Sequence, residues 1–169
     1  MLVDLDYVLG CFLSQWYQDR SGAGLRFKGG TCLRKCYFDN YRYSEDLDFS
    51  AESYISIAEF QTRLASTVNT FGIDLHARPS RFEIVDDDYG FESYQVRLYY
   101  WGPLRRGGDP RAIRMDISHG EYLGLPEVKR ELIHPYSDNP LFAGILRFKR
   151  NDGRKAARFE WTEEIRDIS

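Results

Sequence analysis

Apolar residues recur at helical spacing in two long segments of the chain. Residues 4–20 carry one such stripe, which stops before Ser21 and Gly22, and residues 57–71 carry a second, which stops at Gly72. The members of the first stripe are Leu5, Val8, Leu9, Phe12, Leu13 and Trp16. Each segment is therefore predicted to be a helix with one buried face, and Gly72 is predicted to end the second one.

Between these helices, the spacing of apolar residues changes from that of a helix to that of a strand. Residues 25–28 and 46–49 alternate apolar and polar side chains, which is typical of short strands. A Gly29-Gly30 turn follows the first strand, and Thr31 then fits the N-cap of a short helix over residues 31–38. The first part of the chain thus reads helix, strand, helix, strand, helix.

The later pattern is mostly that of strands. Segments 73–78, 81–85, 94–101 and 112–117 are predicted to be strands, and polar, glycine-rich turns separate several of them. Helices followed by a run of strands predict an α+β fold with a mixed β-sheet packed against helices.

The chain is long enough for one domain with an appendage. We predict a domain over residues 1–146. Residues 147–169 begin with a dense basic run in which Asp152 is the only nearby acid, so this segment is predicted to be a basic C-terminal tail or the start of a second domain.

Composition excludes several classes of protein. The 43% hydrophobic and 15% aromatic content is too high for a disordered chain, and the net charge of −3 excludes a uniformly basic nucleic-acid coat. No apolar run approaches the ~20 residues of a membrane span, and the N-terminus carries Asp4 and Asp6 rather than basic residues. We therefore expect a soluble, cytoplasmic protein with no membrane partner. Its three cysteines are expected to be free thiols that serve packing.

Two carboxylates spaced two apart are the sharpest chemical signal. On a strand, Asp46 and Asp48 project from the same face, and their mutual repulsion calls for a compensating cation. Mg²⁺ (or Mn²⁺) suits such oxygen ligands. Asp116 adds a third acid within a later strand, which would complete a two-metal site for phosphoryl transfer with Asp116 also acting as general base.

A phosphate site is predicted upstream of these acids. The turn at Gly29 and Gly30 lets backbone N–H groups approach an anion, and the helix starting at Thr31 adds a positive dipole end. Arg42 and Ser44 can contact phosphate oxygens by charge and hydrogen bond. Most Gly-Gly turns serve only geometry, so this signal gains weight only beside the acids.

These motifs resemble those of a known family. Gly-Gly before Asp-x-Asp, with a later strand Asp, is similar to the nucleotidyltransferase superfamily related to DNA polymerase β. The longer motif consists of Gly29-Gly30-Thr31-Cys32-Leu33 followed by Arg42-x-Ser44-x-Asp46-Leu47-Asp48-Phe49. It resembles that of the AbiEii toxins of bacterial type IV toxin–antitoxin systems. The resemblance covers residues 25–140, and the helical second domain usual in that family is not recognisable after Ile145.

The resemblance implies a metal-dependent nucleotidyltransferase. It would move a nucleoside monophosphate from an NTP to an acceptor, such as tRNA or a protein, and a cognate antitoxin would be its partner. Two alternatives stay open. One is a catalytically impaired form that keeps the fold and binds nucleotide or a partner. The other is a glycosyltransferase, because Asp-x-Asp also binds Mn²⁺ with a nucleotide sugar, although the Gly-Gly-Thr turn favours the nucleotidyltransferase.

Overall fold

The structure is a computed structural model that describes residues 2–74, 78–86, 93–101, 108–120, 128–133 and 143–146. Its helices in these residues are α1 (Leu2–Gln18), α2 (Gly29–Cys36) and α3 (Ile57–Asp74). Its strands are β1 (Leu25–Lys28), β2 (Asp46–Ala51), β3 (Arg78–Asp86), β4 (Tyr94–Trp101), β5 (Arg111–Ser118), β6 (Val128–Glu131) and β7 (Ala143–Leu146). The α+β class is thereby confirmed.

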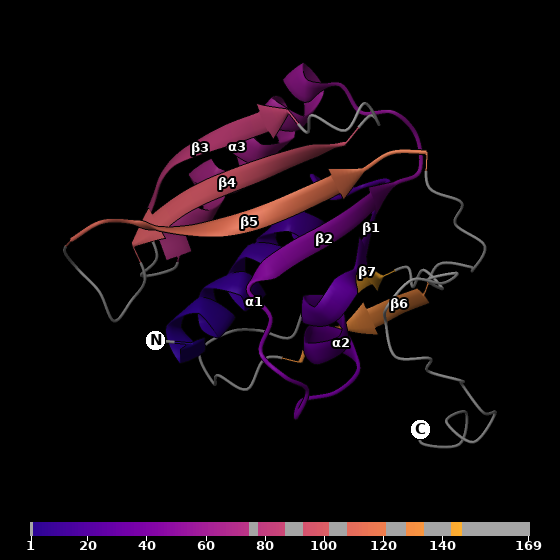
Figure 1. The fold of residues 1–169 in the computed structure, drawn as a ribbon, viewed down its shortest axis with the longest axis vertical. Helices are drawn as coiled ribbons and strands as arrows, with labels where there is room; N and C mark the ends of the chain where they lie inside the picture. Colours follow the sequence, from indigo (N-terminus) through magenta and orange to yellow (C-terminus); the bar gives the residue numbers. More distant parts are fainter. Residues whose placement is uncertain are drawn as a thin grey trace.

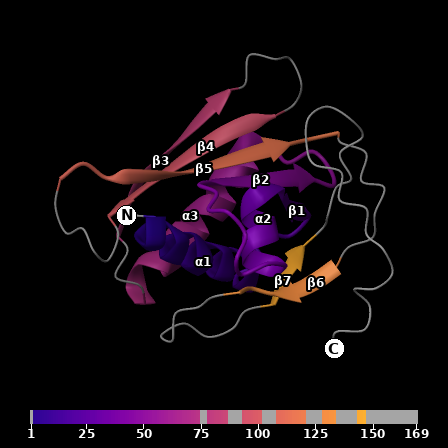
Figure 2. The ribbon, with the colours of Figure 1, turned by 60° about the horizontal axis from the view of Figure 1, so that its bottom comes forward.

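The strands form one mixed sheet in the order β3-β4-β5-β2-β1-β7-β6 (Figure 1). Strands β2 and β5 run parallel, as do β1 and β7, and the other neighbours are antiparallel. Helices α1 and α3 lie along one face of the sheet, and α2 lies beside β1 and β2 (Figure 2). The other face of β4, β5 and β2 carries no helix in the described part of the chain (Figures 1 and 2).

Alternation along the strands separates these two faces. On β4 and β5, every second residue from Tyr94 and from Ile113 is buried toward the helices, and the residues between them are more exposed. Trp16 of α1 anchors the helix layer, because its ring stacks on Phe12 at 5.5 Å and lies 5.6 Å from Phe60 of α3 and 6.5 Å from Phe49 of β2. Among the described residues, β4 and β5 therefore pack against helices on one face only.

Several predicted elements are confirmed, and three are corrected. Strand 94–101 has the predicted bounds, and both long helices are present. Helix α3 continues through Gly72 to Asp74, so the predicted helix end and the start of the predicted strand 73–78 were wrong. A single glycine costs only about 1 kcal/mol within a helix, which the rest of a long helix outweighs.

The Thr31 cap is the third correction. Helix α2 begins two residues earlier, at Gly29, with Lys28 as its N-cap and no capping side-chain hydrogen bond. Strands β6 and β7 were not predicted. The predicted tail over 147–169 lies outside the described residues.

All three cysteines are buried free thiols, as expected. None of the helices described is both long enough and apolar enough to cross a membrane.

A buried ion cluster joins α1 to α2. The Asp6 carboxylate of α1 contacts two cations of α2. Arg34 Nε donates a hydrogen bond to it at 3.0 Å, and Lys35 Nζ forms an ion pair with it at 2.8 Å. Burial opposes ionisation of Asp6, but the charges and hydrogen bonds of Lys35 and Arg34 outweigh it and hold the pKa of this carboxyl below its usual range. Burial conversely lowers the pKa of Lys35, against the charge of Asp6. The charged form of Lys35 is therefore stabilised by the Asp6 carboxylate.

We predict that Asp6→Asn destabilises the protein by about 3 kcal/mol at neutral pH, because it leaves the buried Lys35 charge without its partner. Urea unfolding measures the loss, and Asp39→Asn, an exposed acid beyond α2, is the control and should change little. Since the folded-state pKa of Asp6 is lowered, its contribution is present above the ordinary aspartate pKa and is lost as the pH falls through the folded value. The difference between wild type and variant should thus close only in strong acid. A difference that stays constant throughout strong acid, or one that already closes near neutral pH, would contradict the assignment.

Candidate active site

The register between β2 and β5 brings the predicted acids together. Asp48 is paired with Asp116. Two residues earlier on both strands, and on the same face, Asp46 is paired with Arg114. Neighbouring strands lie about 4.8 Å apart, and residues two apart on a strand about 6.6 Å. The structure therefore places Asp46, Asp48 and Asp116 on one patch of sheet, although some seventy residues of chain separate β2 from β5.

Burial of the intervening residues fixes the direction of these side chains. Leu47 and Phe49 on β2 are fully buried on the helix side, as are Met115 and Ile117 on β5. The acids between them must then project from the opposite face, which carries no helix among the described residues. We call this side of β4, β5, β2 and β1 the open face.

The acids interact electrostatically. Burial raises the pKa of Asp46; Arg114 opposes the rise, while the charges of Asp116 and Glu45 add to it. Like-charge repulsion therefore reaches Asp46 from Asp116 across the two strands, whereas the repulsion expected between Asp46 and Asp48 stays a prediction.

A hydrogen bond orients the third acid. Gln95 of β4 is paired with Asp116, and its Nε2 donates to Asp116 Oδ1 at 2.9 Å. The sequence analysis did not single out Gln95. Gln95 is a polar residue in the alternating pattern of β4, which indicates that its side chain lies on the polar face. The pattern does not indicate that β5 is the neighbouring strand.

The acids fit a metal held jointly with a substrate. Within the described part of the chain, no three His, Cys, Asp or Glu side chains are close enough to hold a metal ion between them. Mg²⁺ commonly takes only one or two protein carboxylates and fills its other positions with water and phosphate oxygens. The neighbouring carboxylates of Asp48 and Asp116 meet that smaller requirement.

Gly29 lies directly against one of these acids. A Cβ built on Gly29 would stand 1.9 Å from Asp48 Oδ2, and the residue has a φ of +77°, a conformation that favours glycine. Only a residue without a side chain lets the start of α2 come this close to the Asp48 carboxylate.

Gly30, the second residue of α2, lies against the segment before β2. A Cβ there would lie 3.1 Å from Ser44 Oγ and 3.7 Å from an Arg42 guanidinium nitrogen, so both side chains lie against the turn. Thr31 is buried, and its hydroxyl donates to the Asp46 carbonyl at 2.6 Å. The Thr31 side chain thus ties α2 to the first residue of β2, and the two halves of the predicted motif form one unit.

His119 belongs to the packing rather than to the acid patch. Its Nε2 accepts a hydrogen bond from the Ile55 backbone N–H at 3.3 Å, and its ring lies 5.3 Å from Tyr54 and 5.4 Å from Tyr94. These contacts give His119 a structural role. His76 and His134 lie outside the described residues.

Comparison with known proteins is consistent with this arrangement. The family described as "Nucleotidyl transferase AbiEii toxin, Type IV TA system" matches residues 11–149, a span that contains every residue of the candidate site. The chain belongs to the AbiEii family. The resemblance inferred from the Gly-Gly and Asp-x-Asp motifs is thus confirmed.

Solved structures show the same fold. JHP933 from Helicobacter pylori is similar over 70% of this chain with a TM-score of 0.52 and 18% identity. A second H. pylori protein, described as a candidate nucleotidyltransferase, is similar over 69% of the chain with a TM-score of 0.50 and 19% identity. This AbiEii chain covers only 44% of either protein. A comparison with curated protein sequences finds no match.

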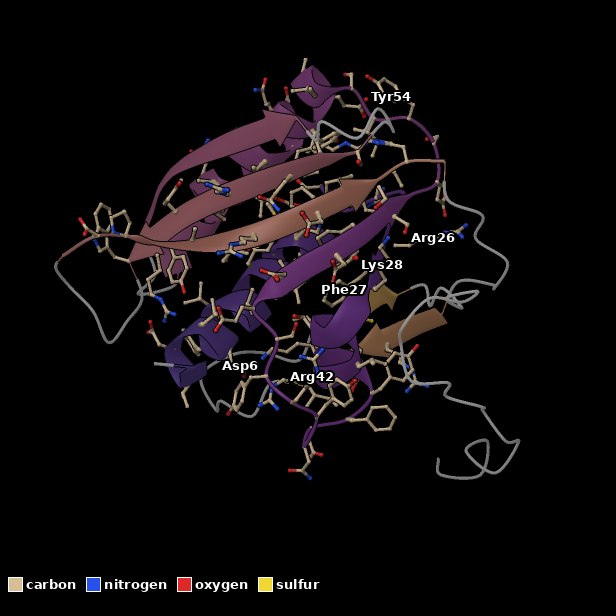
Figure 3. All side chains as sticks on the ribbon, in the orientation of Figure 1. Asp6, Arg26, Phe27, Lys28, Arg42 and Tyr54 are labelled. Atoms are coloured by element: carbon tan, nitrogen blue, oxygen red, sulfur yellow. The ribbon has the colours of Figure 1, made fainter. Side chains whose placement is uncertain are left out.

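One cation at the site of this AbiEii chain was missed by sequence analysis. Lys28, the last residue of β1, is paired with Asp48, and its Nζ lies 3.4 Å from Ser118 Oγ on β5 (Figure 3). Its position directly before Gly29-Gly30 was visible in the sequence. The pairing of β1 with β2, which turns Lys28 toward the acids, was not.

We predict that Gly29→Ala destabilises the protein more than Gly24→Ala. The two glycines have nearly equal φ values, +77° and +75°, so alanine meets the same backbone strain of roughly 1–2 kcal/mol at both. Only Gly29 has a neighbour within 4 Å of the new Cβ, namely Asp48. The extra loss should be about 1–3 kcal/mol, measured by urea unfolding.

As a control, both glycine substitutions are repeated in a protein that also carries Asp48→Ala. This change removes the clashing carboxylate, so the two glycine variants should then lose equal stability. An extra loss at Gly29 that persists in this background would show that the contact with Asp48 is not its cause.

Proposed function

We propose that this chain is a metal-dependent nucleotidyltransferase that moves a nucleoside monophosphate from an NTP to an acceptor. The observation that supports the proposal most directly is the pairing of Asp48 with Asp116 beside the Gly29-Gly30 turn. A carboxylate pair next to a helix start with exposed N–H groups combines a cation site with an anion site.

The residues divide into two groups by their chemistry. Asp48 and Asp116, with Asp46 nearby on the same face, would hold Mg²⁺ or Mn²⁺ jointly with the triphosphate, and the bound ion would neutralise phosphate charge and polarise the α-phosphate. The start of α2 at Gly29 and Gly30 would receive the triphosphate. Arg42 and Ser44, which lie against Gly30, would contact its oxygens.

The transfer itself is a substitution at the α-phosphorus. The acceptor hydroxyl oxygen forms a new bond to this phosphorus, the bond to the β-phosphate oxygen breaks, and pyrophosphate leaves. Asp116 takes the hydroxyl proton as general base. Gln95 holds one oxygen of that carboxylate, which orients the other.

Family membership supports the wider biological setting. We propose that the protein acts in the cytoplasm as the toxin of a type IV toxin–antitoxin system, with a cognate antitoxin as its partner and with tRNA or a protein as acceptor. The alternative is a nucleotide- or partner-binding form without transfer activity, since the chain covers less than half of the similar H. pylori structures.

The transfer activity can be measured directly. The protein is incubated with each α-labelled NTP, Mg²⁺ and either total tRNA or cell protein, and label on the acceptor is quantified. We expect transfer by the wild type and a loss of at least about 100-fold in Asp116→Asn, because the proposed base is removed. Asp109→Asn, an exposed acid before β5, is the matched control and should keep full activity. Binding of NTP without transfer would favour the alternative.

Metal binding gives a second prediction that is independent of the acceptor. Mg²⁺ or Mn²⁺ should raise the thermal midpoint of the wild type, because a ligand that binds only the folded state stabilises it. Asp48→Asn should lose this response. It should also be at least as stable as the wild type without metal, since one of the repelling charges is gone. An equal metal response in both proteins would exclude Asp48 as a ligand.

A further inference from the structure

We propose that Lys28 is a substrate-positioning residue whose ammonium group binds the triphosphate above the paired carboxylates. The inference rests on the proposed function, because it places the NTP on the open face. It assigns to β1 a role that none of the residues predicted from the sequence supplies.

The backbone places Lys28 in line with the acids. Its Cα is paired with that of Asp48, which is in turn paired with that of Asp116. Paired residues project from the same side of a sheet. Lys28, Asp48 and Asp116 therefore form one row across β1, β2 and β5, with the cation at the end next to Gly29.

The side chain extends across β2, from this row toward the next same-face pair, Ser50 and Ser118. Lys28 is half-buried, and its Nζ lies 3.4 Å from the hydroxyl of Ser118, two residues beyond Asp116 on β5. To reach β5 from β1, the side chain must cross β2. The ammonium group consequently lies on the open face next to the pair Asp48–Asp116, rather than in solvent beside the sheet (Figure 3).

The second cation of β1 has a different partner. Arg26 projects from the same face as Lys28, two residues earlier, and its guanidinium is within 3.4 Å of Glu52 Oε1 after the end of β2. Arg26 thus faces away from the acid row, which makes it a matched control for the charge of this strand.

Charge explains what Lys28 contributes. An NTP brings several negative charges onto a face that already holds three carboxylates, and a divalent ion offsets only part of them. A lysine ammonium is a compact point charge suited to phosphate. Because the residue immediately precedes Gly29-Gly30, its charge and the N–H groups of the α2 start would act on the same phosphates.

This role predicts opposite effects on two ligands. Towards a divalent ion alone, Lys28 is a like charge, so removing it should tighten binding. Towards the triphosphate it is an opposite charge, so removing it should weaken binding. A residue that only supported the fold would weaken both.

The experiment titrates Mn²⁺ alone, and then a non-hydrolysable NTP in saturating Mg²⁺, by calorimetry. For Lys28→Met we expect NTP affinity at least tenfold lower, equivalent to about 1.4 kcal/mol, and Mn²⁺ affinity equal to or higher than that of the wild type. Lys28→Arg should retain most NTP affinity, and Arg26→Met should bind both ligands as the wild type does. Circular dichroism checks folding. Lys28→Gln, which keeps a hydrogen-bond donor for Ser118, replaces the Met variant if that variant does not fold.

The outcomes separate this inference from the proposed function. Wild-type NTP affinity in the neutral Lys28 variants would overturn the role of Lys28 while leaving the nucleotidyltransferase proposal intact. A parallel loss of Mn²⁺ and NTP affinity would also overturn it, in favour of a structural role. If the wild type and Arg26→Met bind neither ligand, both proposals fail.

Discussion

The parallel pairing of β2 with β5 is the constraint on which the candidate site depends. Leu47 and Phe49 must reach the core on one strand, and Met115 and Ile117 on the other, so the register cannot shift by one residue without exposing apolar side chains. The same register sets Asp48 directly beside Asp116. Hydrophobic burial on the helix side thus enforces a proximity of like charges on the open face that the carboxylates themselves resist.

The neighbours of the acid patch are arranged around that repulsion. Gly29 has no side chain where Asp48 approaches, Gln95 donates to Asp116, and Lys28 brings a positive charge across β2. These residues come from α2, β4 and β1, which adjoin β2 and β5 in space. The site is therefore assembled by the order of elements in the sheet and not by one contiguous motif.

Because the site is assembled from several strands, the sequence could predict only those of its residues that belong to local motifs. The period-two acids at Asp46 and Asp48 identify their own face, and the Gly-Gly turn identifies a close backbone approach, because both signals are local. Gln95 and Lys28 acquire their meaning from strand neighbours, which a single sequence does not state. Thr31 was misassigned for a similar reason. A threonine after a turn fits a cap, but here its hydroxyl bonds to the carbonyl of Asp46, fifteen positions later in the chain.

Two acids of this chain show how a structural carboxylate differs from one available to a ligand. Asp6 is buried with Lys35 and Arg34, and their charges overcome its desolvation and lower its pKa. Burial also opposes ionisation of Asp46, but Arg114 only partly offsets it and Asp116 adds repulsion, so the pKa rises. The first acid has its counter-charges inside the fold, whereas the charge of the second is incompletely compensated by the protein. An additional cation on the open face would therefore lower the free energy of the ionised patch, and would have no comparable effect at Asp6. This incomplete compensation supports the proposal that a cation binds on the open face.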